Sequence, residues 1–147
     1  MKTIHQHCFR GEKVLIRVDF NVPVNADMQI TDDTRMRAAL PTISKILNDG
    51  GSVILMSHRG RPKNGPEDQF SLKYLVDHLG LILNRKVSFI ADCLGDEVKT
   101  KAHSLSEGEV LLLENLRFYN EEIVGDTIFA KQLSELADVY VNDAFGT

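Results

Sequence analysis

Short apolar runs recur along the chain, and most of them do not alternate with polar positions. Such runs are typical of strands that are buried on both faces, as in a parallel sheet. They fall at residues 14–20, 52–56, 86–90, 110–113 and 139–141. We therefore expect a buried strand at each of these places.

Between these runs, apolar residues recur at helical spacing. A first helix is predicted by Met36, Leu40, Ile43, Ile46 and Leu47. Pro41 lies inside this pattern and removes one backbone hydrogen bond, so we expect a kink or a short first turn there. Gly50 and Gly51 favour an end to the helix just before them.

Two more helices are predicted further along. Ser71 is a candidate N-cap, with Phe70 and Leu75 placed to pack across it. The helix that begins after Ser71 would bury a stripe made of Leu72, Leu75, Val76 and Leu79. The last helix, capped by Asp126 or Thr127, is predicted by Ile128, Phe129, Leu133, Leu136 and Ala137.

Strands that alternate with helices predict right-handed βαβ units and a parallel sheet. The expected fold is Rossmann-like, with three layers, α/β/α. The 147 residues suit a single domain. No helix follows the run at 139–141 to cover it, so we expect this sequence to be a truncated domain.

Composition narrows the class of protein. Hydrophobic residues make up 43% and charged residues 26%, the usage of an ordinary globular protein. No apolar run is long enough to cross a bilayer, and residues 1–10 lack a signal-peptide core, so we expect a cytoplasmic protein without membrane partners. Cys8 and Cys93 form no C-x-x-C pair, which argues against a disulfide framework or thiolate zinc. The net charge of −4 argues against a general nucleic-acid binder.

Polar side chains follow several predicted strands, at the edge where ligands of open parallel sheets bind. They are Asp19 and Asn21, residues 57–63, residues 114–118, and Asn142 with Asp143. Arg35 and Arg37 stand near the start of the first helix, whose N-terminus should open onto the same edge.

An acidic protein thus gathers cations on one rim. They are His58, Arg59, Arg61, Lys63 and Arg117, with Arg35 or Arg37 beside them. Guanidinium groups repel one another unless an anion joins them, and their planar fork matches phosphate and carboxylate. A small, multiply charged anion is expected, with Asp19 and Asn21 orienting a hydroxyl. The chain has neither G-x-x-x-x-G-K-[ST] nor G-x-G-x-x-G, so either the anion is not a nucleotide or a nucleotide binds elsewhere.

Five segments resemble motifs of the phosphoglycerate kinase family, in the family's order and at similar spacings. They are residues 17–23, 30–35, 57–62, 114–118 and 142–147, and the resemblance covers nearly the whole chain. It implies a two-domain, monomeric kinase that moves a phosphoryl group between 1,3-bisphosphoglycerate and ADP. Residues 1–147 would be part of its N-terminal, 3-phosphoglycerate-binding domain. A C-terminal domain, missing here, would bind Mg-ATP or Mg-ADP, and the fragment alone would be inactive.

The resemblance also implies residue roles. Asp19 and Asn21 would contact the hydroxyl and carboxyl end of the substrate. The non-transferred phosphate would be bound by His58, Arg61 and Arg117. Arg35 would stabilise charge on the transferring phosphoryl group and is the catalytic residue. No cofactor-binding or metal-binding residue is implied in this stretch.

Simpler structural interpretations stand beside these roles. Arg17 and Asp19 could form a structural ion pair, and residues 31–33 could cap a helix. For three charged residues we expect a solvated surface position: Arg37, Lys63 and Arg59, the last at a position where the family usually has an apolar residue. His5, His7 and Cys8 have metal-ligand spacing, but clusters at a chain end are seldom sites. Asn142 and Asp143 could shape a turn or help form the crevice.

Three other functions compete with the kinase. A binding domain without turnover would keep only the anion site. An RNA-binding module is disfavoured by the net charge and by the lack of exposed aromatics among the basic residues. A nucleotide-dependent dehydrogenase is disfavoured by the missing glycine fingerprint.

Overall fold

The computed structural model describes residues 6–63, 66–119 and 127–143. A parallel five-stranded sheet in the order β3-β4-β2-β1-β5 forms its centre. The strands are β1 (Lys13–Val18), β2 (Ser52–Met56), β3 (Val87–Phe89), β4 (Val110–Leu112) and β5 (Val139–Asp143). Each predicted apolar run overlaps one of these strands, so the expected parallel sheet is confirmed.

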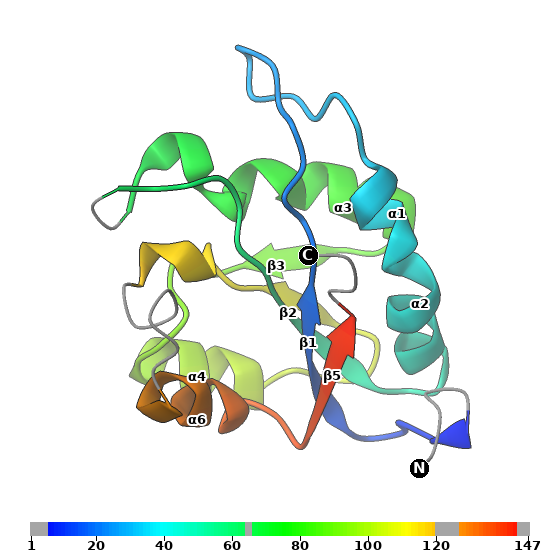
Figure 1. Cartoon of the computed structure of the whole chain (residues 1–147). Helices are drawn as coiled ribbons and strands as arrows, with labels where there is room; N and C mark the ends of the chain where they lie inside the picture. Colours follow the sequence, from blue (N-terminus) through cyan, green and yellow to red (C-terminus); the bar gives the residue numbers. More distant parts are fainter. Residues whose placement is uncertain (1–5, 64–65, 120–126, 144–147) are drawn as a thin grey trace.

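Helices cover both faces of the sheet (Figure 1). One face carries α1 (Thr34–Ala38), α2 (Leu40–Asn48) and α3 (Val76–Leu83); the other carries α4 (Asp96–His103) and α6 (Thr127–Ser134). Three 3₁₀ helices lie in the connections: η2 (Asp68–Phe70), η3 (Leu72–Leu75) and η4 (Leu116–Phe118). The three-layer α/β/α prediction is therefore confirmed.

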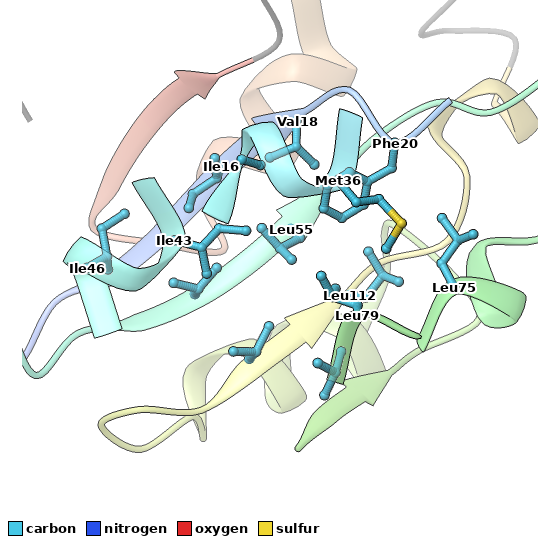
Figure 2. Close-up of a cluster of buried hydrophobic side chains, with 14 of the residues drawn as sticks. Ile16, Val18, Phe20, Met36, Ile43, Ile46, Leu55, Leu75, Leu79 and Leu112 are labelled. Atoms are coloured by element: carbon cyan, nitrogen blue, oxygen red, sulfur yellow. The ribbon is translucent and has the colours of Figure 1, made fainter. Parts of the chain in front are cut away.

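The sheet separates two hydrophobic clusters because successive side chains of a strand point to opposite faces. In β1, Ile16 joins the cluster under α1, α2 and α3, whereas Leu15 joins the one under α4 and α6. Figure 2 shows the first cluster, where Ile43 and Ile46 of α2 lie over β1 and β2. Full burial of side chains of this size stabilises a fold by roughly 1.5–3 kcal/mol each.

The first predicted helix is divided in two. α1 ends at Ala38 and α2 begins at Leu40, with Pro41 in the first turn of α2. Proline is tolerated there because the first turn has no intrahelical acceptor for its missing N–H. The expected short first turn is thus confirmed, as is the helix end before Gly50, which has a φ of 97°.

The other two predicted helices form, but they differ from the prediction in detail. Residues 72–83 are divided between η3 and α3, and Val76 is half-buried. Thr127 is the first residue of α6 and not its cap, and Leu136 and Ala137 lie beyond the end of α6. Ser71 does act as an N-cap, for η3, and accepts a hydrogen bond from the backbone N–H of Lys73 at 3.2 Å. In α6, Phe129 and Leu133 are buried but Ile128 is 68% exposed. The alternative cap Asp126 lies outside the described residues. α4 was not predicted, because Val98 and Ala102 are its only buried residues.

Among the helices of the described ranges, none combines the length and the apolar content that a transmembrane span requires.

Candidate functional site

Ser57 connects three strand ends at the carboxyl edge of the sheet. β2 lies between β1 and β4, so the segments that follow these strands lie next to one another. Ser57 is fully buried, and its Oγ accepts a hydrogen bond from the backbone N–H of Phe20 at 2.9 Å. Its carbonyl accepts one from the N–H of Leu116 at 3.0 Å. The segments after β1, β2 and β4 are therefore fixed to each other.

Asp19, Asn21 and Arg35 lie together beyond the end of β1. The Arg35 guanidinium Nη1 donates a hydrogen bond to the Asn21 carbonyl at 3.1 Å and lies 3.4 Å from Asp19 Oδ1. The same carboxylate oxygen accepts a hydrogen bond from the Asn21 backbone N–H at 3.1 Å. The Arg35 side chain remains 53% exposed. The start of α1 thus opens onto this edge, as expected.

The Asn21 side chain reaches across to the segment that carries His58 and Arg61. Its Oδ1 accepts a hydrogen bond from the Gly60 backbone N–H at 2.9 Å. Gly60 has a φ of +66°, and a Cβ built there would lie 2.3 Å from the Phe70 ring. Only glycine fits this turn without strain. Arg61 follows directly and is exposed.

Asn115 joins the same segment to the one that carries Arg117. Its Oδ1 accepts hydrogen bonds from the backbone N–H groups of Arg59 (3.1 Å) and Arg117 (3.0 Å). Its Nδ2 donates to the carbonyls of Arg59 (2.6 Å) and Phe70 (2.9 Å). The fully buried amide therefore uses both of its donors and both of its acceptor positions.

Glu114 fixes the start of η3 against the end of β4. Its Oε1 accepts hydrogen bonds from the backbone N–H groups of Leu72 (2.8 Å) and Asn115 (2.9 Å). Its Oε2 accepts one from Ser71 Oγ at 2.7 Å. The residue is 8% exposed, and these three donors compensate for the burial of its carboxylate.

Ser57, Glu114 and Asn115 lie in the polar stretches that were expected at this edge, but no role was predicted for them. Their side chains hydrogen-bond to the backbone of the segments that carry the basic residues. Each of the three lies in one of the five motif segments, just after a buried strand. A polar residue that continues an apolar run, as Glu114 and Asn115 do after β4, was the available signal, since a buried polar group must find partners.

The predicted cations divide by environment. His58 and Arg117 are half-buried, and Arg61 is exposed. Arg37 and Lys63 are surface charges, as expected; Arg37 Nε donates to Asp33 Oδ2 at 2.8 Å. The expected surface position of Arg59 is wrong. The residue is only 5% exposed, because the segment at η2 covers it.

Burial perturbs two titratable groups near this edge. It lowers the pKa of the Arg59 guanidinium, with a smaller opposing effect from Tyr74. At the end of β5, burial raises the pKa of the Asp143 carboxyl, against a hydrogen bond with Thr42. Asn142 is exposed, and the rest of the last motif, residues 144–147, lies outside the described residues.

Within residues 6–63, 66–119 and 127–143, no three His, Cys, Asp or Glu side chains are grouped to hold a metal ion. His7 lies 2.5 Å from Glu12, Cys8 is exposed, and His5 falls outside the described part.

The family model for phosphoglycerate kinase matches residues 4–147. The chain is 54% identical over 146 residues to a phosphoglycerate kinase of Chloroherpeton thalassium, covering 99% of this chain and 36% of that protein. It is 50% identical over 146 residues to that of Desulforudis audaxviator, covering 99% and 37%. The chain thus spans little more than a third of the length of these relatives.

Solved structures agree. Phosphoglycerate kinase from Pyrococcus horikoshii OT3 matches with a TM-score of 0.87 and 35% identity, over 100% of this chain and 37% of that one. The enzyme from Coxiella burnetii matches with a TM-score of 0.84 and 38% identity, over 96% and 34%. On the strength of the matched family model, the relatives and these structures, the chain belongs to the phosphoglycerate kinase family.

Proposed function

We propose that this chain supplies the acid-substrate side of a phosphoglycerate kinase, a glycolytic phosphotransferase with a carboxyl group as acceptor. The reaction is reversible transfer of a phosphoryl group between 1,3-bisphosphoglycerate and ADP, giving 3-phosphoglycerate and ATP. One observation supports it most strongly. Hydrogen bonds made by Asn21, Ser57 and Asn115 hold together the three segments that carry the predicted substrate residues.

The physical roles follow from charge and position. His58, Arg61 and Arg117 bind the phosphate that is not transferred, because two guanidinium groups and an imidazole N–H donor on neighbouring segments match a multiply charged anion. Asp19 and Asn21 orient the hydroxyl and carboxyl end. Arg35 stabilises charge on the transferring phosphoryl group; its exposed guanidinium, anchored beside Asp19, can reach a ligand without leaving the rim.

No residue of this chain is assigned to the Mg-nucleotide in this proposal. The sequence lacks a glycine-rich phosphate loop, and no metal-binding group is found in the described part. As the family resemblance implies, residues 1–147 form part of the N-terminal, 3-phosphoglycerate-binding domain in this proposal, and a C-terminal domain outside this sequence binds Mg-ATP or Mg-ADP. The enzyme acts as a cytoplasmic monomer, without nucleic-acid or membrane partners.

Calorimetry on the 147-residue chain tests the proposal. We expect weak, salt-sensitive binding of 3-phosphoglycerate, no binding of ATP and no turnover. Arg61→Ala and Arg117→Ala each remove a charge-assisted contact and should weaken binding by at least about tenfold. The control is Arg85→Ala, an exposed arginine that precedes β3 at the opposite edge of the sheet.

Two outcomes would contradict the proposal. One is failure of the wild-type chain to bind 3-phosphoglycerate while it remains folded. The other is equal affinity for random RNA, which would favour a nucleic-acid-binding function for the arginines.

A further inference from the structure

Arg59 is a buried guanidinium with few partners. Its Nη1 donates one hydrogen bond, to the Gln69 carbonyl at 2.8 Å. Its Nε is buried and has no hydrogen-bond acceptor in the described part of the chain. No carboxylate of the described residues lies within ion-pair distance of it.

Burying a charge without an opposite charge is unfavourable, because the interior replaces the lost hydration poorly. Arginine nevertheless keeps its proton in proteins. Arg59 should therefore lower the stability of this fold relative to an apolar side chain of similar size, the kind of residue that the family resemblance leads one to expect at this position.

The backbone of Arg59 belongs to the segment that carries His58 and Arg61, and Asn115 joins it to the segment that carries Arg117. The Arg59 N–H donates to the same Asn115 oxygen as the N–H of Arg117. Its neighbours in sequence are His58 and Gly60, and the Gly60 N–H is bound by Asn21. A charge buried here is screened less by water than a charge on the surface, so its electrostatic effect falls off less steeply with distance.

The hydrogen bond to Gln69 is not the only contact that fixes this segment. Asn115 Nδ2 binds the carbonyls of both Arg59 and Phe70, and Gly60 packs closely against the Phe70 ring. None of these contacts uses the Arg59 side chain. A guanidinium is therefore not required to hold η2 against this segment.

From these observations we infer that Arg59 is a further affinity-determining residue: a buried, uncompensated cation that strengthens binding of the anionic substrate from beneath the rim, at a cost in stability. The inference rests on the proposed function, since it takes 3-phosphoglycerate as the ligand. It assigns Arg59 no contact with the substrate.

Three substitutions separate the effect of the Arg59 charge from the effect of its hydrogen bond to Gln69. Arg59→Met removes the charge and the hydrogen bond, Arg59→Gln removes the charge but keeps an N–H donor, and Arg59→Lys keeps the charge. The matched control is Arg85→Met, because exposed Arg85 also donates from Nη1 to a carbonyl, that of Gly108 at 3.3 Å, but before β3 and β4 at the opposite edge.

For each variant, the affinity for 3-phosphoglycerate is measured by calorimetry and the unfolding midpoint by thermal unfolding. We expect Arg59→Met and Arg59→Gln to bind about fivefold more weakly than the wild type, and Arg59→Lys to bind within about twofold of it. Arg59→Met should also raise the unfolding midpoint, by about 3 °C. A purely structural residue would instead lower the midpoint when replaced. Arg85→Met should leave affinity unchanged.

The outcomes are distinguishable. If the wild-type chain binds 3-phosphoglycerate and Arg59→Met binds equally well, the inference about Arg59 is wrong and the proposed function stands. The inference is also overturned if Arg59→Gln retains full affinity, or if Arg59→Met lowers the unfolding midpoint. If the folded wild-type chain does not bind the ligand, both fall.

Discussion

Asn115 fixes three segments through one amide group. Both of its donors and both of its acceptor positions are used, and the side chain is fully buried. A partner lost at such a position leaves a backbone group without a hydrogen bond in the interior, which costs more than the bond itself contributes.

Asn115→Asp tests this arrangement with almost no change in shape. The carboxylate cannot donate, so the carbonyls of Arg59 and Phe70 lose their bonds and face a negative charge. We expect the free energy of unfolding, measured with urea, to fall by about 3 kcal/mol. The control is Asn48→Asp on the exposed end of α2. Equal effects of the two substitutions would contradict the assigned role.

Sequence reasoning found the residues that follow strands and missed the ones that hold them. Asp19, Asn21 and Arg35 were predicted from their place after β1 and at the first helix, and they lie together in the structure. Arg59 was assigned to the surface because charged side chains usually are exposed. Arg59 is buried by η2, which packs against it in the folded structure. The residues around Arg59 in the sequence do not indicate this contact.

At the level of elements, α1 depends on its neighbours. Its five residues are too few for a helix to be stable alone. Met36 is fully buried, and Asp33, just before the helix, lies 2.8 Å from His78 Nε2 of α3. The hydrogen bond with His78, and then that with Arg37, lowers the pKa of the Asp33 carboxyl. The ionised carboxylate therefore stabilises the folded state.

This lowered pKa predicts a pH dependence. Its contribution is fully present above the unfolded pKa, near 4, and is lost as the pH falls through the lower folded value. Asp33→Asn should therefore lower the urea midpoint at pH 7, and the difference from wild type should shrink below about pH 4. Asp27→Asn, in an exposed turn, is the control. A difference that stays constant down to pH 2 would exclude this linkage.

The elements themselves were largely predictable, for a physical reason. β2 and β4 consist of residues buried on both faces, so their apolar runs are uninterrupted. α4 was missed because it buries little: most of its residues are polar, and Val98 and Ala102 alone form no recognisable period. Ile128 was misjudged because one residue of an apolar pair at the start of α6 faces away from the sheet.

At the level of the whole molecule, β5 is the last strand on its side of the described sheet. Val139 and Val141 are half-buried and Tyr140 is 50% exposed. An edge strand with exposed apolar side chains can pair with another copy. We expect the chain to associate as its concentration rises.

Tyr140→Lys should reduce this association, because a charge on an edge strand opposes pairing. The association of the 147-residue chain is measured by light scattering over a range of concentrations. Ile128→Lys is the matched control, since Ile128 is also an exposed apolar residue but lies on α6 rather than at an edge. If the two substitutions reduce association equally, general solubility rather than edge pairing is responsible.

The position of β1 has a consequence for how this chain acquires its fold. β1 pairs with β2 on one side and with β5 on the other, and the backbone N–H of Lys13 meets the Asp138 carboxylate across 125 positions of sequence. Contacts so distant along the chain require closure of a long loop before they form, which slows folding. During synthesis, β1 leaves the ribosome long before β5, so its second side stays without a strand partner until residues 139–143 have been made.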